Sequence, residues 1–144
     1  MSLERPDHAD ADLVLKLYDL RRETVMRDSR TKLSQFLPRT WEDFLAITQP
    51  THPLNAAFRQ VSSYWEMAYG FARHHIVNAD FLIENTTEGL FIYAKVLPFL
   101  ARFRKEVSPT AFGNTEWITT QCETGKQRLE MVQGRVRKML ETSK

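Results

Sequence analysis

The chain has 144 residues, of which 42% are hydrophobic and 26% are charged, and its formal net charge is +2. This length is typical of a single domain, and we expect one domain over residues 1–144. The composition excludes a disordered chain, and the small net charge gives little support to a polyanionic partner.

The first predicted helix runs from about Ala9 to Leu37 and is closed by Pro38. Its apolar residues recur at helical spacing, at Leu13, Leu17, Leu20, Met26, Leu33 and Phe36. A short second helix is expected after Thr40, because Thr40 and Asp43 approximate a capping box in which Asp43 replaces the usual Glu or Gln.

A third predicted helix follows the turn at residues 50–53 and reaches about His75. Its apolar positions alternate by four and three, at Leu54, Phe58, Val61, Trp65, Ala68, Ala72 and His75. This spacing predicts that Trp65 is buried and places His75 at the inner end of the core. The aromatic residues cover a wide arc of this helix, which is typical of a central helix surrounded by neighbours.

The fourth predicted segment begins with either Asn78 or Asp80 as its cap and is broken near Thr86. Its later part again follows helical spacing, at Ile92, Val96, Phe99 and Phe103. We expect a kink near Pro98, because proline removes a backbone hydrogen bond to Ala94 and crowds that carbonyl group.

The last predicted helix follows a loop at residues 108–115, is capped by Asn114 or Thr115, and runs nearly to the C-terminus. It carries a strict heptad seam, formed by Ile118, Cys122, Gly125, Leu129, Val132, Val136 and Met139. No strand-like alternation persists anywhere in the sequence. The fold class is therefore predicted to be all-α, an antiparallel bundle of four main helices plus one short helix.

The segments YWEMAYGFARHH (residues 64–75) and VLPFLARFR (residues 96–104) place an aromatic and acidic helix before a proline-containing one. In this respect the middle third of the chain resembles small all-helical bacterial proteins of unknown function. The resemblance implies a helical fold and no known activity.

Localisation is predicted from three features. The polar segment at residues 1–12 lacks the apolar core of a signal peptide. The longest apolar stretch, Gly89–Phe103, is too short for a bilayer span and contains Lys95. The lone Cys122 excludes an internal disulfide framework and fits a reducing compartment. We expect a cytoplasmic protein without membrane association.

Neither metal binding nor catalysis is predicted. Consecutive helical residues point about 100° apart, so His74 and His75 cannot face one metal ion together. The Glu-x-x-His and His-x-x-x-His patterns of helical metal sites are both absent from the sequence. Cys122 lies on the seam, where a thiol behaves as a small hydrophobe. We expect no catalytic residue, no cofactor and no metal.

A ligand pocket is the first alternative function, as part of a ligand-binding or enzymatic bundle. Its candidate residues are Tyr64, Trp65, Glu66, Tyr69 and His75. Filling of the core is the preferred interpretation of the aromatic residues, although bundle cores do host such pockets. For Glu66 a solvated position is preferred over a buried one that accepts a hydrogen bond from Tyr or Trp.

A nucleic-acid-binding regulator is the second alternative, with Arg135, Arg137 and Lys138 as its contact residues. Basic clusters stand toward the C-terminal parts of the predicted helices and acidic residues toward the N-terminal parts. This arrangement complements the helix dipole and needs no nucleic acid to explain it. Nucleic acid is therefore not the expected partner.

The preferred function is a non-catalytic one that acts through protein–protein contacts, including a homodimer. At 1.5 Å per residue the first and last helices would each span about 40 Å and the third about 33 Å, which leaves apolar seam uncovered. We expect a second chain to cover part of that seam, at Leu129, Val132 and Val136. The sequence leaves open whether the seam packs within one chain or between two, and it names no partner.

Overall fold

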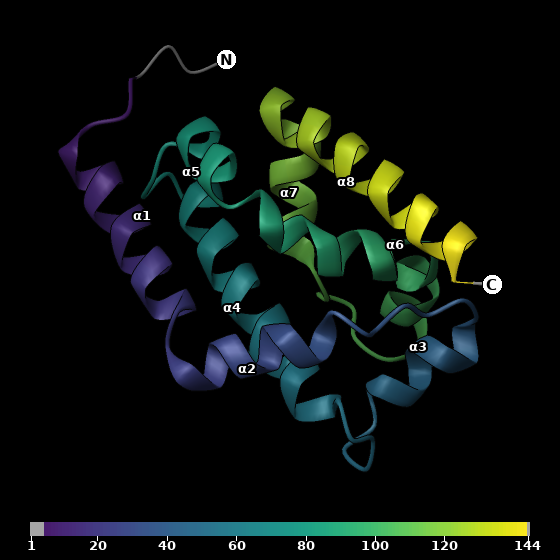
Figure 1. The fold of residues 1–144 in the computed structure, drawn as a ribbon. Helices are drawn as coiled ribbons and strands as arrows, with labels where there is room; N and C mark the ends of the chain where they lie inside the picture. The colour runs from purple at the N-terminus through teal and green to yellow at the C-terminus, as the bar shows by residue number, and fades with distance from the viewer. Residues whose placement is uncertain (1–4, 144) are drawn as a thin grey trace.

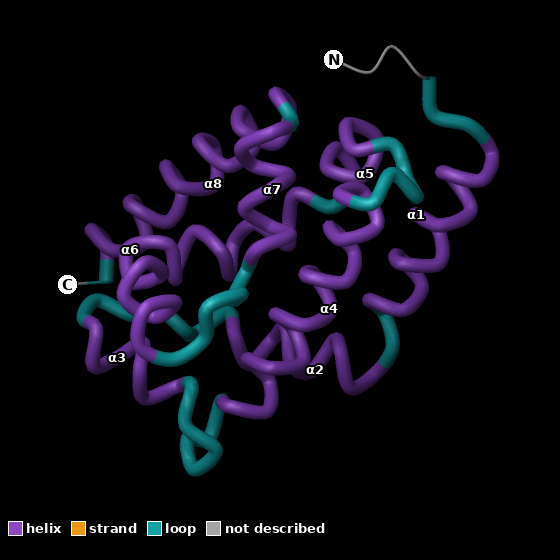
Figure 2. The backbone as a smooth tube through the Cα atoms, turned by 180° about the vertical axis from the view of Figure 1, so that it is seen from behind, coloured by secondary structure: helices purple, strands orange, loops and turns teal. Residues whose placement is uncertain are grey.

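The computed structural model describes residues 5–143, and that range is all-helical, with eight α-helices, one short 3-10 helix and no strand (Figure 1, Figure 2). The elements are α1 (His8–Arg21), α2 (Thr24–Leu33), α3 (Trp41–Ile47), α4 (Asn55–Arg73), α5 (Ala79–Asn85), η1 (Thr87–Gly89), α6 (Leu90–Glu106), α7 (Gly113–Gln121) and α8 (Glu123–Thr142). The all-α prediction is confirmed. The predicted division into four main helices and one short helix is not met.

Helix α4 is central, as the wide arc of its aromatic residues predicts. It packs against α2 on one side and α7 on the other, and α6 packs against α8 (Figure 1). One hydrophobic core joins buried side chains from Leu17 in α1 to Val136 in α8. Trp65 is 3% exposed within this core, so its predicted burial is confirmed.

The first predicted helix is in fact two helices. Helix α1 ends at Arg21, and the Glu23 backbone is extended at φ −57° and ψ 144°. The Glu23 carboxylate accepts a hydrogen bond from the Met26 N–H at 3.0 Å and so caps α2. The turn allows Leu17 and Met26 to be buried in the same core. The single helix from Ala9 to Leu37 was a wrong prediction.

The last predicted helix is also divided. Cys122 is extended at φ −116° and ψ 122°, which ends α7 and lets α8 pack beside it. A Cβ atom at Gly125 would overlap the Ile118 carbonyl oxygen and lie 2.8 Å from its carbon. The residues of the predicted seam are therefore divided between α7 and α8, which pack against each other. Gly125 permits the close approach of the α7 and α8 backbones.

Two of the three predicted helix caps agree with the structure; the third, at Asn114 or Thr115, was wrong, because α7 begins at Gly113 with Phe112 as its N-cap. Thr40 and Asp43 form a capping box at α3, and the Asn78 side chain caps α5. The expected break near Thr86 separates α5 from η1. Helix α6 continues through Pro98 without interruption, and the kink stays a prediction.

None of the described helices has both the length and the hydropathy to cross a membrane.

Candidate functional site

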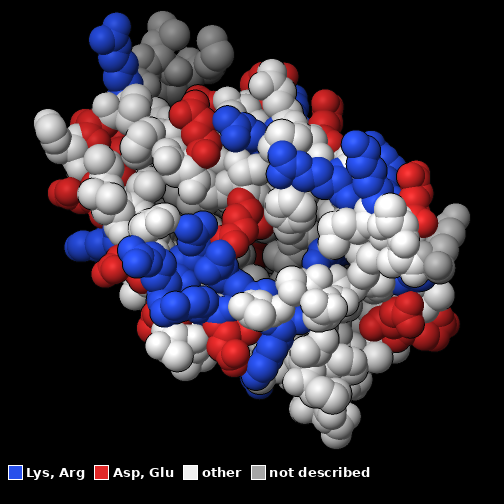
Figure 3. All heavy atoms as spheres, viewed as in Figure 1, with Lys and Arg blue, Asp and Glu red and all other residues white. Residues whose placement is uncertain are grey.

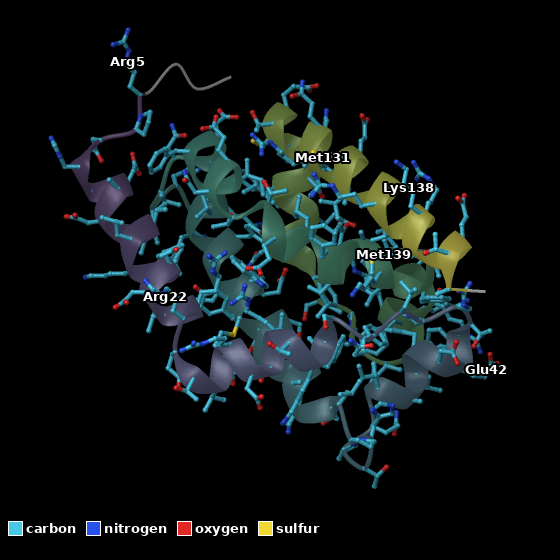
Figure 4. The ribbon with its side chains drawn as sticks, in the orientation of Figure 1. Arg5, Arg22, Glu42, Met131, Lys138 and Met139 are labelled. Carbon is cyan, nitrogen blue, oxygen red and sulfur yellow. The ribbon has the colours of Figure 1, made fainter. Side chains whose placement is uncertain are left out.

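An apolar cavity opens between α2, α4, α6 and α8, with a volume of about 310 Å³. Figure 3 shows a hollow near the centre of this face, and Figure 4 shows Met139 on the inner side of α8 with Lys138 on its outer side. The apolar walls are formed by Leu33, Phe36, Val61, Trp65, Ile92 and Met139. The volume lies at the lower end of the 300–1,000 Å³ typical of ligand pockets. We call it the α2/α6 cavity.

A buried lysine from α6 lines the same cavity. Lys95 is 8% exposed, and its Nζ atom donates to the Leu33 carbonyl oxygen at 3.3 Å. An ammonium group has three N–H donors, and no described carboxylate lies within ion-pair distance of this one. Burial lowers the pKa of Lys95. The cavity wall therefore carries a positive charge without a negative partner in the described chain.

The acidic residue that lines the cavity, Glu88, is already held by two arginines. Its Oε2 atom accepts a hydrogen bond from Arg21 Nη1 at 3.0 Å, and its Oε1 atom accepts two from the Arg30 guanidinium, with Nε at 3.0 Å. The cluster joins α1, α2 and η1 through partly buried side chains. Because both carboxylate oxygens are occupied, Glu88 is not free to neutralise Lys95.

A second cavity, of about 290 Å³, lies beside α1 and is lined by Arg21, Tyr64 and Trp65 among others. Trp65 lines both cavities, so its side chain lies between them. The Tyr64 hydroxyl donates to the Leu17 carbonyl oxygen, and burial raises the pKa of Tyr64 to about 12. This contact ties α1 to α4.

The position of Trp65 depends on a glycine in η1. A Cβ atom at Gly89 would lie 2.6 Å from the Trp65 ring and would also overlap the Tyr69 hydroxyl oxygen. Trp65 in turn stacks on Tyr69, with ring centroids 5.9 Å apart. The absence of a side chain at Gly89 therefore makes room for the wall that separates the cavities.

The five predicted pocket residues do not converge on one site. Tyr64 and Trp65 line cavities, whereas Tyr69 is fully buried and donates its hydroxyl to the Thr86 carbonyl oxygen at 2.6 Å. His75 lines a different cavity, of about 770 Å³, together with Asp10, Trp117 and Cys122, and Glu66 lies against the start of α7. The prediction located the part of α4 that reaches the cavities and did not identify their charged residues.

Glu66 binds the start of α7. Its carboxylate accepts hydrogen bonds from the Asn114 N–H at 3.1 Å, the Thr115 N–H at 2.8 Å and the Thr115 hydroxyl at 2.6 Å. The side chain is half-buried and its partners are neither Tyr nor Trp, so Glu66 fits neither the solvated position nor the buried one that was weighed against it. Glu66 satisfies N–H groups that a helix start otherwise leaves unpaired.

His75 lies outside the core, contrary to the prediction. Helix α4 ends at Arg73, and His75 takes the left-handed conformation at φ 60° just beyond the helix, where glycine is common. Its ring is exposed and meets Trp117 edge to face at 6.4 Å. Among the described residues, no group of three His, Cys, Asp or Glu side chains is placed to hold a metal ion.

The residues predicted for self-association are covered within one chain. Val132 is fully buried, Val136 is 6% exposed and Leu129 is half-buried, because α8 packs on α6 and α7. A second chain cannot cover Val132 or Val136 in this conformation. The seam is intramolecular, which corrects the prediction at these two positions.

Basic side chains on the face of Figure 3 form separate groups. One lies at the turn between α1 and α2 and another follows α8, with acidic and uncharged side chains between them. Arg135, Arg137 and Lys138 are exposed on α8. On this face the groups do not join into one continuous positive surface.

Three charged residues of the site, Lys95, Arg30 and Glu88, are not among the residues predicted from the sequence. The only local signal was a single lysine inside the apolar stretch at residues 89–103, which was used to argue against a membrane span. The Leu33 carbonyl that Lys95 meets is 62 residues away along the chain.

Comparison with known proteins assigns the chain to a family whose function is not described. The model of a family described as a domain of unknown function (DUF4760) matches residues 6–122, so the chain belongs to that family. The match agrees with the resemblance to uncharacterised helical proteins and ends one residue before α8. No curated protein and no solved structure matches the chain.

Proposed function

We propose that this member of the DUF4760 family is a non-catalytic binding protein whose α2/α6 cavity takes a small apolar molecule. The observation that supports the proposal is the cavity itself, with a volume of about 310 Å³ and walls of Leu33, Trp65, Ile92 and their apolar neighbours. Predominantly apolar walls with a few polar groups are typical of small-molecule sites.

Binding is favoured over catalysis because Glu88 is held in ion pairs and Cys122 is a buried thiol. Both oxygens of Glu88 are held by Arg21 and Arg30, so this carboxylate would have to break its ion pairs before it could accept a proton. Cys122 is buried elsewhere, and burial raises the pKa of its thiol, which disfavours the nucleophilic thiolate. A free, buried cysteine also fits our proposal that the protein acts in the cytoplasm.

Nile red, a neutral apolar dye, tests the proposal. We expect its emission to rise when it binds the wild-type protein. Ser34→Phe places a ring at the edge of the cavity and should weaken that binding, whereas Ser63→Phe, on an exposed part of α4, should not. Circular dichroism checks that both variants fold. Unchanged emission with wild-type protein, or equal binding by both variants, would contradict the proposal.

A second candidate function is contact with another protein, first of all a second copy of the chain. Four large apolar side chains between residues 15 and 25 are exposed, namely Leu15 (64%), Tyr18 (48%), Leu20 (53%) and Val25 (58%). Leu15 and Tyr18, three residues apart, share one face of α1, away from the intramolecular seam of α8, whereas Leu20 lies on another side of α1 and Val25 lies on α2. We propose the face with Leu15 and Tyr18, in place of Val132 and Val136, as the self-association site.

A further inference from the structure

We infer that the ligand of the α2/α6 cavity is an amphipathic carboxylate, whose acidic head binds Lys95 and whose apolar part packs against Trp65 and its neighbours. This inference rests on the proposed function and adds the chemical class of the ligand.

The head-group position follows from Lys95. Its side chain is more than nine-tenths buried, lines the cavity, and has one protein acceptor, the Leu33 carbonyl oxygen at 3.3 Å. Two N–H donors of the ammonium group are therefore available for a ligand among the described groups. A buried charge is stable only when it is paired and hydrogen-bonded, and a carboxylate supplies both the charge and the acceptors.

The balance of charge around the cavity favours an anion. Arg21, Arg30 and Lys95 supply three positive charges, and Glu88 is the carboxylate that binds the two arginines. These four side chains therefore have a net charge of +2, and Lys95 is the one of the three cations that has no carboxylate partner among the described residues. A head group with a single negative charge is enough to pair with Lys95, since Arg21 and Arg30 are already engaged with Glu88.

The apolar part of the ligand is limited by the cavity. Its walls include Phe36, Val61 and Trp65 from two sides of the core, and about 310 Å³ of space lies between them. An alkyl chain of medium length or a compact aromatic ring system suits a cavity near the lower limit for ligand pockets. We therefore expect a medium-chain fatty acid or an aromatic acid, and octanoate serves as the probe.

Octanoate and octanol differ at the head group and share their alkyl chain, so displacement of Nile red by each compound tests the inference. Octanoate should bind the wild-type protein at least about tenfold more tightly than octanol, the factor expected for hydrogen bonds to a charged group. Lys95→Met should remove that preference and leave octanol binding unchanged. Lys105→Met, at an exposed position of the same helix, should behave as wild type.

The outcomes separate the two proposals. Equal binding of octanoate and octanol by the wild-type protein would overturn the carboxylate inference and leave the apolar cavity as a binding site. Failure of Nile red and both probes to bind would overturn the proposed function itself. The comparison of the two probes on wild-type protein remains decisive even if Lys95→Met does not fold.

Discussion

Lys95 places a positive charge in the wall of an apolar cavity, beside Leu33 and within reach of a ligand. A buried ammonium group costs free energy that apolar burial nearby must offset. Such a residue weakens the unliganded protein and strengthens its complex with an anion, a common relation between stability and function.

We therefore predict that Lys95→Met stabilises the unliganded protein at pH 7 by about 0.5–2 kcal/mol. Since burial lowers the pKa of Lys95, the unfolded chain binds this proton more tightly than the folded one. Wild-type stability should then rise with pH from the folded pKa toward about 10.4, the value for an unfolded lysine. The advantage of the variant should shrink over the same range. Urea unfolding at pH 7 and pH 10 measures both effects.

Lys105→Met is the control, because this lysine is exposed on the same helix and its replacement should change stability little. A Lys95→Met protein that is less stable than wild type at pH 7 would refute the view that the buried charge is unfavourable.

For single residues, burial could be predicted from sequence where it follows from spacing along one helix. Trp65 was predicted to be buried from its place in a series of apolar positions, and it is. Lys95 broke a similar pattern, but its role depends on Leu33 and Trp65, which other helices bring to it. Periodicity shows that a charge lies among apolar residues, not what surrounds it in space.

At the element scale, the position of α7 depends on a carboxylate from α4. Glu66 accepts hydrogen bonds from both Asn114 and Thr115, at the start of α7, while Asn114 donates to the Glu66 carbonyl oxygen at 3.0 Å. These contacts join two helices that also pack along their lengths. Acidic groups are favourable at this end of a helix.

Glu66→Ala is predicted to lower the free energy of unfolding by about 1.5–3 kcal/mol, as expected for lost hydrogen bonds to a charged group. Glu66→Gln keeps one acceptor oxygen, so its free energy of unfolding should fall less than that of Glu66→Ala. Hydrogen exchange should quicken in residues 113–121 more than elsewhere. Glu130→Ala, at an exposed position of α8, is the control. Equal stability of Glu66→Ala and the control would show that Glu66 does not hold α7.

Two glycines of α8 give a matched test of the turn between α7 and α8. Gly125→Ala should destabilise the protein by about 1–3 kcal/mol or more, because the added Cβ atom overlaps the Ile118 backbone. Gly134→Ala should stabilise it by up to about 1 kcal/mol, since the nearest atom to its added Cβ is 3.8 Å away, at the end of the Arg137 side chain. Thermal unfolding compares them. Similar changes of the same sign in the unfolding temperatures of the two variants would contradict the described packing of α7 against α8.

The helix starts after Thr40 and Asn78 were predicted, whereas the breaks within the first and last predicted helices were not, for a physical reason. The caps at Thr40 and Asn78 are formed by residues close in sequence, so local chemistry identifies them. The breaks near Glu23 and at Cys122 contain neither glycine nor proline. They depend on how the following helix packs against the core, which helical periodicity does not reveal.

At the scale of the whole molecule, the all-α class followed from the periodic apolar pattern, but the number of helices and the cavity did not. The heptad seam suggested a surface for a second chain, and the turn at Cys122 instead buries Val132 and Val136 inside one chain. Leu15 and Tyr18 are exposed on α1, where the predicted single helix gave no indication of a surface for a second chain.

We predict that the protein forms a dimer through that surface at high micromolar concentration. Leu15→Glu should give a folded monomer, because Leu15 is 64% exposed, whereas Val132→Glu should unfold because Val132 is fully buried. Ile76→Glu, at another exposed apolar position, should remain dimeric. Light scattering with circular dichroism distinguishes these cases. A monomeric wild-type protein at that concentration would rule out self-association.

Our proposal is that the α2/α6 cavity binds an amphipathic carboxylate at Trp65 and Lys95. It is tested most directly by titrating octanoate into ¹⁵N-labelled protein and following the indole N–H signals of Trp41, Trp65 and Trp117. Only Trp65 lines the cavity, so its signal should shift in a saturable manner while the other two stay in place. Octanol should shift it only at much higher concentration. No shift at Trp65, or a larger shift at Trp41 or Trp117, would contradict the account.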